Sequence, residues 1–332
     1  MAPWSALLFS EGTALHLWQI RHIPNHPQTL LKLTVAAAAS FGLAVTLFYS
    51  TGFVSGQTAE DAKKKAEATD SEPDAAEFFE QVRQELQTHQ SVKADLSQTV
   101  SIGEQQFKIT GQYLSSGHSA DGMKLMLNYT VVPDQGVTGK ILEVCDGKEL
   151  WTVLTLPDSK RVTLRNVMQI QKAAAAASKK NIPDSTLNAE LGLGGLTALL
   201  ASLERSVDFD VIKQEQSDAG PRTIIQGHWK KEILERFPKG KDNSLPAFVP
   251  DLVRLYVNAE TLFPEKLLYL KRQPESKKLR PLVNLEFRNV ELDTPVDDAA
   301  FKIEIPDIVP EDITKLYLDR INGTPETAAP AK

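Results

Sequence analysis

Cysteine is nearly absent from this chain, since Cys145 is the only one among 332 residues. A single cysteine excludes an internal disulfide and any CxxC motif for metal binding or redox chemistry. Cys145 stands between Val144 and Asp146 in a predicted strand. We therefore expect a small buried hydrophobic side chain there rather than a reactive thiol.

An excess of one charge is missing as well. Lys and Arg number 37 against 43 Asp and Glu, and the two signs are mixed along the chain. The basic surface of a nucleic-acid-binding protein is therefore not expected. Three histidines fall in the predicted folded part, namely His89, His118 and His228. None is followed three or four residues later by a second histidine or a cysteine, so we predict no metal site and no cofactor.

Motifs typical of catalysis are lacking too. The glycine run Leu191–Gly195 precedes a predicted helix, but no Lys-Ser or Lys-Thr pair follows it as in a phosphate-binding loop. We expect a turn or a hinge there instead. His228 fits a surface histidine at a strand end better than a catalytic base. We predict a binding protein and no enzyme, because no residue supports the alternative of an enzyme acting on lipid or glycan.

The segment Leu33–Val54 is a long apolar run without a charged residue. Its length matches the roughly 20 residues that a bilayer crossing needs. Arg21 and Lys32 precede it and Glu60 and Asp61 follow it, which predicts a cytoplasmic N-terminus and a folded part outside the cytoplasm. Two fates stay open, a cleaved signal peptide and an uncleaved anchor, and the uninterrupted length favours the anchor.

The chain is expected to divide into five segments. They are a cytoplasmic leader at 1–32, a transmembrane anchor or signal peptide at 33–54, a disordered linker at 55–74, one folded domain at 75–320 and a disordered tail at 321–332. The linker is charged and lacks large apolar side chains, so it cannot bury enough surface to fold.

Strict alternation of apolar and polar residues predicts the strands of the folded domain. Phe107, Ile109 and Tyr113 share one parity, and Leu125, Leu127 and Tyr129 repeat the pattern. Such a period of two is typical of half-buried strands, and short turn signals between the runs favour antiparallel hairpins. Further strands are expected at 207–212, 222–228, 252–258, 265–272, 282–291 and 301–305.

Four helices are predicted around these strands, at 75–88, 167–180, 196–204 and 311–318. The first has Asp74 as a candidate N-cap and carries Phe78, Phe79, Val82 and Leu86 at helical spacing. A sheet of ten or more strands must twist and curl. The predicted fold class is therefore α+β, a curled antiparallel sheet (a β-half-barrel) with helices covering the concave face.

The order of several short motifs carries a resemblance. A helix ending in FFEQVRQEL leads to ADLSQTV, GQYLSS, LNY and then ILEVCDGKELWTVLTLPDSKRVTL, and VDDAAFKIEIP closes the domain. This order resembles the LolA-type family of periplasmic lipoprotein carriers and lipoprotein-sorting proteins, over about 75–306. The matching residues are Leu96, Gln98, Gly111, Asp146, Gly147, Lys148 and Trp151. One position departs from the family, because Met126 stands where its carriers usually have an arginine that controls the helical lid.

The resemblance implies an incomplete barrel on the periplasmic side of the inner membrane, with helices over an apolar cavity for acyl chains. A curled sheet with one apolar face and a helical cover also predicts an enclosed ligand site by itself. The candidate ligand-binding residues are Phe107, Ile109, Tyr113, Leu125, Leu127, Tyr129, Trp151 and Phe209. Ordinary core packing is the alternative for each of them, and the face of Trp151 depends on the strand register.

The sequence thus predicts a non-enzymatic, periplasm-facing binder or carrier of lipids or lipidated proteins in lipoprotein trafficking. Its expected partners are lipid acyl chains or lipoproteins, and a membrane partner protein, with membrane association through the N-terminal segment. The alternative is a membrane-tethered envelope sensor or protein-interaction module on the same fold.

Overall fold

The computed structural model describes residues 74–117, 122–178, 191–217, 220–235, 237, 245–273, 275–306 and 308–322. The predicted leader, the apolar run at 33–54, nearly all of the linker and most of the tail lie outside these residues, as does His118. Among the helices of the described ranges, none is both long and apolar enough to cross a bilayer.

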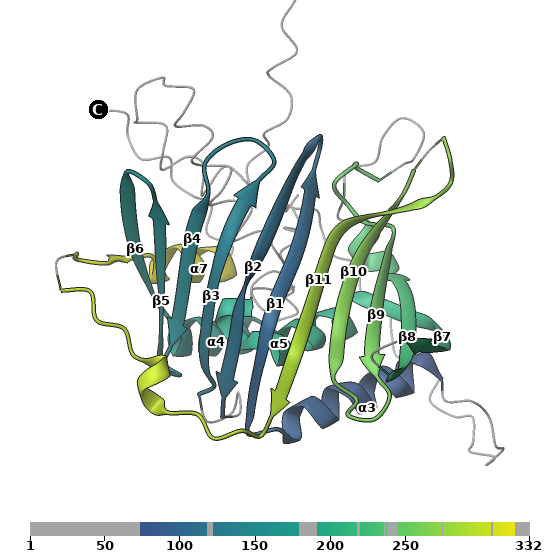
Figure 1. Cartoon of the computed structure of the whole chain (residues 1–332), viewed down its shortest axis with the longest axis horizontal. Coiled ribbons are helices and arrows are strands. Elements are labelled where there is room, and N and C mark those ends of the chain that lie inside the picture. Colours follow the sequence, from purple (N-terminus) through teal and green to yellow (C-terminus); the bar gives the residue numbers. More distant parts are fainter. Residues whose placement is uncertain are drawn as a thin grey trace, which may run out of the picture.

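Twelve strands form one sheet with the order β12-β6-β5-β4-β3-β2-β1-β11-β10-β9-β8-β7. Neighbouring strands are antiparallel throughout, except that β12 pairs with β6 in parallel. The sheet is curled and its two end strands do not meet, so the predicted half-barrel is confirmed (Figure 1). The strands are β1 Ser91–Ile102, β2 Gln105–Ser116, β3 Lys124–Pro133, β4 Gly139–Cys145, β5 Glu149–Leu156, β6 Ser159–Asn166, β7 Val207–Ser217, β8 Gly220–Trp229, β9 Leu252–Asn258, β10 Pro264–Arg272, β11 Leu279–Leu292 and β12 Glu311–Asp312.

Helices cover one face of this sheet, which we call the concave face. They are α3 Ala75–Thr88, α4 Val167–Ser178, α5 Leu191–Ser206, the one-turn α6 Lys231–Leu234 and α7 Thr314–Ile321. Figure 1 shows α4 and α5 behind the strands and α3 crossing below β9 and β10. Helix α3 has the predicted bounds and the N-cap Asp74, and it buries Phe78, Phe79, Val82 and Leu86 as predicted.

The predicted strand Phe301–Ile305 is wrong. Asp298–Phe301 forms the 3₁₀ helix η2 instead, and the carboxylate of Asp297 accepts a hydrogen bond from the amide of Ala299 at 2.9 Å. An aspartate in this position caps a helical turn, and the turn brings Phe301 into a buried site. Alternation over so few residues did not distinguish the two structures.

The closing helix also starts later than the predicted residue Glu311. Glu311 and Asp312 form β12, and the amide of Ile313 continues the pairing by donating to the Leu164 carbonyl at 2.9 Å. The Asp312 carboxylate then accepts a hydrogen bond from the amide of Thr314 at 2.8 Å, where α7 begins.

Gly111 allows β2 and β3 to approach each other closely. It lies opposite Tyr129, and a Cβ atom added to it would stand 2.1 Å from the carbonyl oxygen of Asn128. Backbone atoms on both strands fix this separation, so no side chain fits. The glycine of the GQYLSS motif therefore has a steric role in the sheet.

We predict that Gly111→Ala destabilises the protein by about 3 kcal/mol, because β2 and β3 must move apart. Urea unfolding measures the change. Gly103→Ala is the control, since nothing lies within 4 Å of a Cβ atom added there. Its left-handed backbone should cost only about 1 kcal/mol. Equal losses for the two variants would contradict the steric explanation.

A polar junction connects the end of α3 to the end of β11. The ring atom Nδ1 of His89 lies 2.8 Å from Oδ2 of Asp293, and the amide of Gln90 donates to Oδ1 of Asp293 at 2.7 Å. The hydrogen bond with His89 is the main cause, and that from Gln90 the second, of a lowered pKa of Asp293.

This junction should contribute to the pH dependence of stability. A carboxyl group whose pKa is lowered by folding stabilises the protein above its unfolded pKa, and this contribution is lost as the pH falls through the folded pKa. Asp293→Asn keeps the shape of the side chain and tolerates the left-handed backbone, φ 57°. We expect the variant to be less stable than the wild type at pH 7 and the difference to shrink below about pH 4. Urea titrations at both pH values test this, and an unchanged difference would argue against it.

Candidate functional site

The concave face is apolar, and most of the predicted ligand-binding residues lie on it. Seven of the eight belong to one buried cluster, namely Phe107, Ile109, Tyr113, Leu125, Leu127, Tyr129 and Phe209. None of the seven is more than 9% exposed. Residues directly opposite each other on neighbouring strands share a face, and Tyr113 lies opposite Leu127. The predicted shared face is therefore confirmed, whereas a ligand-binding role stays a prediction.

Trp151 lies on the other face, which we call the convex face. Its cross-strand partners are Val144 on β4 and Leu164 on β6, whereas its neighbour Leu150 pairs with Cys145 and belongs to the buried cluster. Because successive residues of a strand point to opposite faces, Trp151 cannot share the face of Leu150. The prediction that Trp151 lines the apolar cavity is therefore wrong, because the strand register puts its side chain on the convex face.

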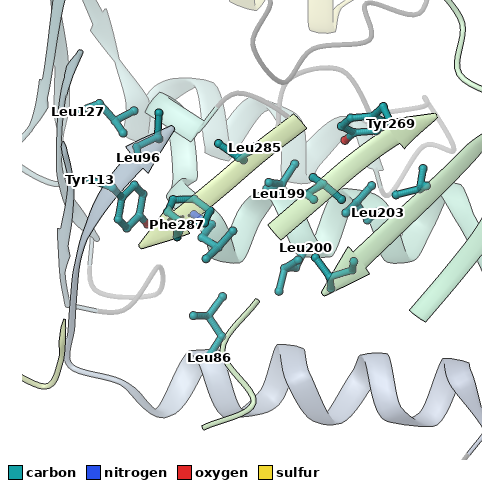
Figure 2. Close-up of a cluster of buried hydrophobic side chains, with 14 of the residues drawn as sticks. Leu86, Leu96, Tyr113, Leu127, Leu199, Leu200, Leu203, Tyr269, Leu285 and Phe287 are labelled. Atoms are coloured by element: carbon teal, nitrogen blue, oxygen red, sulfur yellow. Dashed lines mark hydrogen bonds between the residues drawn. The ribbon is translucent and has the colours of Figure 1, made fainter. Parts of the chain in front are cut away.

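Helix α5 covers the cluster with leucines at positions i, i+3, i+4 and i+7. Leu196, Leu199, Leu200 and Leu203 are at most 3% exposed. Figure 2 shows the last three against Leu285 and Tyr269 of the sheet, with Leu86 of α3 beneath them. The sequence prediction placed a helix here but missed these leucines as part of the site, although their spacing is typical of a buried helix face.

Aromatic contacts join the covering helices to the sheet. Phe79 of α3 stacks on Phe209 of β7 with 4.4 Å between ring centroids. Tyr113 of β2 meets Phe287 of β11 edge to face, with centroids 5.6 Å apart. The cluster thus extends from β2 across β11 to β7 at the end of the sheet.

Tyr113 also holds the start of the covering part of α5. The amide of Leu196 donates a hydrogen bond to the Tyr113 hydroxyl at 3.1 Å. Just before it, Gly195 interrupts the helix with φ 61° and ψ −160°, a conformation essentially restricted to glycine. A Cβ atom on Gly195 would stand 2.7 Å from the Tyr113 hydroxyl. Burial raises the pKa of Tyr113, so the hydroxyl stays protonated and neutral. The predicted glycine turn is therefore a kink inside α5.

Arg165 is the one charged side chain among the buried residues that the structure describes, at 6% exposure. It forms an ion pair with Glu143 at 3.2 Å and donates hydrogen bonds to the hydroxyl groups of Thr152 and, at 2.9 Å, Tyr317. These contacts attach α7 to β4, β5 and β6. Sequence reasoning missed the group, because polar residues at alternate strand positions look like a solvent-facing set.

Met126, the residue at the departure from the LolA-type pattern, lies on the convex face. It pairs with Leu114 on β2 and with Val144 on β4. Its side chain therefore points away from α3 and α5, whereas Tyr113 and Arg165 provide polar contacts to helices on the concave side.

The expectation for Cys145 is confirmed, since this thiol is buried and 3% exposed. Burial raises its pKa to about 11, so the thiol stays protonated at neutral pH. In the described ranges, no group of three or more His, Cys, Asp or Glu side chains is arranged to hold a metal ion.

Neither a known family model nor a curated protein matches the sequence. Solved structures do match. One is described as an outer membrane lipoprotein-sorting protein domain from Vibrio parahaemolyticus, with 13% identity, a TM-score of 0.29 and coverage of 68% of this chain and 95% of that one. Another is LprF from Mycobacterium bovis, with 13% identity, a TM-score of 0.31 and coverage of 67% and 94%.

A third is a DUF1329 family protein from Desulfovibrio piger, with 12% identity, a TM-score of 0.30 and coverage of 69% and 95%. The curled sheet with helices on its concave face is the fold that the resemblance in the sequence motifs implied. Likenesses at these TM-scores carry no argument about function.

We predict that Tyr113→Phe loosens α5. The ring stays in place, but the Leu196 amide loses its acceptor, and an unsatisfied buried N–H costs about 1–3 kcal/mol. Hydrogen exchange at the start of α5 should become faster than in the wild type. Tyr269→Phe is the control, because Tyr269 is a similarly buried tyrosine at 3% exposure. Equal exchange rates in the wild type and Tyr113→Phe would show that the hydrogen bond does not hold the helix.

Proposed function

We propose that this protein binds the acyl chains of lipids or of lipidated proteins on its concave face, as a non-enzymatic carrier or acceptor on the periplasmic side of the inner membrane. The observation that carries the proposal is the continuous apolar face under α3 and α5. Its buried residues come from both halves of the sheet and from both helices. An extended apolar ligand fits such a surface better than a polar one does.

The contacts at the start of α5 would let this helix move aside for a ligand. Leu199 and Leu200 are at most 1% exposed, so an acyl chain reaches the face only if α5 moves. The hydrogen bond between Leu196 and Tyr113 and the kink at Gly195 both lie at the N-terminal end of the part of α5 that carries these leucines. Each methylene that leaves water contributes about 0.8 kcal/mol, so an acyl chain has enough binding energy to displace leucine contacts.

Affinity should therefore depend on chain length and on the concave face alone. The test measures how well saturated fatty acids of about 8 to 18 carbons compete with a fluorescent fatty acid for binding to the purified protein. Each added methylene should tighten binding up to about fourfold until the face is filled. Native mass spectrometry of gently purified protein should also show bound lipid. Uniform affinity along the series, together with lipid-free masses, would contradict the proposal.

A photoactivatable fatty acid then locates the site. Adducts are expected on concave residues such as Leu127 and Leu200. Leu127→Ala should raise the chain length at which affinity stops increasing, because it leaves more room. Val153→Ala is the matched control, since Val153 is also buried, at 6% exposure, but pairs with Val162 on the convex face. Adducts confined to Trp151 and its convex neighbours would place the site elsewhere.

A further inference from the structure

The two ends of the sheet are protected unequally. At one end, β12 pairs with Thr163 and Leu164 of β6, and Arg161 forms an ion pair with Glu311 at 2.6 Å. At the other end, β7 pairs with β8 and has no further strand beside it in the described part of the chain (Figure 1). Such an edge has unpaired backbone groups that are able to join another strand.

The distal half of β7, Val211–Ser217, is the exposed part of this edge. Lys213, Gln214, Glu215 and Gln216 are all exposed, whereas the first residues of β7 lie against α3, where Phe209 stacks on Phe79. A register shift between Phe209 and Val211 separates the two halves. The free edge is thus a regular seven-residue segment beyond the covering helix.

The charges on this segment are self-complementary. If two copies of β7 pair antiparallel about Gln214, Lys213 lies directly opposite Glu215 of the second copy, and Glu215 lies opposite Lys213 of the second copy. Lys213 pairs with Ile224 and Glu215 with Arg222 on β8, so both lie on the convex face. Opposite charges directly across two strands stabilise their pairing. Neither Lys213 nor Glu215 forms an ion pair with another described residue of its own chain.

We propose that a second copy of this chain adds to the sheet through β7, in a symmetric antiparallel pairing centred on Gln214. The two-fold axis of such a pairing is perpendicular to the sheet. Both concave faces therefore lie on the same side of the joined sheet. One edge strand from each copy is a small contact compared with standard interfaces, so the dimer forms at micromolar or higher protein concentrations.

Charge exchange tests the pairing in the full chain in detergent micelles, by sedimentation equilibrium. Lys213→Glu places two pairs of like charges across the interface and should raise the dissociation constant at least about tenfold, and Glu215→Lys should do the same. An equimolar mixture of the two variants should form heterodimers with nearly wild-type affinity, because each pair again joins opposite charges. Single variants that dimerise like the wild type would overturn the proposal.

Oxidative cross-linking fixes the register independently. Gln214→Cys places two thiols face to face, with Cα atoms about 4.5–5.5 Å apart, which is within the range for a disulfide. Gln216→Cys is the matched control, because Gln216 faces Ile212 of the second copy and its own counterpart lies four residues away along the strand. We expect a cross-linked dimer with the first variant and none with the second. Equal cross-linking of both variants would exclude this dimer. A protein that stays monomeric at all concentrations would also exclude it, and the free edge of β7 would then be available to a strand from a different protein.

Discussion

Burial of one apolar face of a wide antiparallel sheet is the constraint on which the rest of the structure depends. Strands β1 to β5 and β7 to β11 all contribute inward residues to one cluster, and a face of that size is not stable in water. Curling reduces its exposed width, and the helices α3 to α7 cover the remainder. The leucines of α5 and the phenylalanines of α3 are therefore as much a part of the fold as the strands beneath them.

The segment after β11 adds contacts on the convex face and at one edge of the sheet. Helix η2 packs against β3, and its Asp298 pairs with Lys124 at 2.6 Å. The chain then adds β12 to the edge of β6 and forms α7 on the concave side. One continuous segment thus contacts β3, protects an edge of the sheet and contributes Tyr317 to the Arg165 group.

The sequence predicted most where a pattern repeats over many residues. Alternation in β2 and β3 placed Phe107, Tyr113, Leu127 and Tyr129 on one face. The helical spacing from Phe78 to Leu86 predicted α3 with its correct bounds. It failed where the structure depends on partners far away in the chain. The face of Trp151 follows from the register of β4 and β6. The inward direction of Arg165 depends on Tyr317, which lies more than a hundred residues later.

The leucines of α5 set a limit on what a ligand gains on the concave face. An acyl chain that replaces Leu199 and Leu200 exchanges one set of apolar contacts for another. Exposing the displaced leucines to water costs free energy and offsets part of the gain from burying the acyl chain. Net affinity is therefore the difference between two similar quantities rather than the full transfer energy of the chain. We therefore expect the proposed binding of acyl chains to be reversible. In the proposed binding, small changes at the kink of Gly195 or at the hydroxyl of Tyr113 should shift the balance between the helix-covered face and the ligand-occupied face.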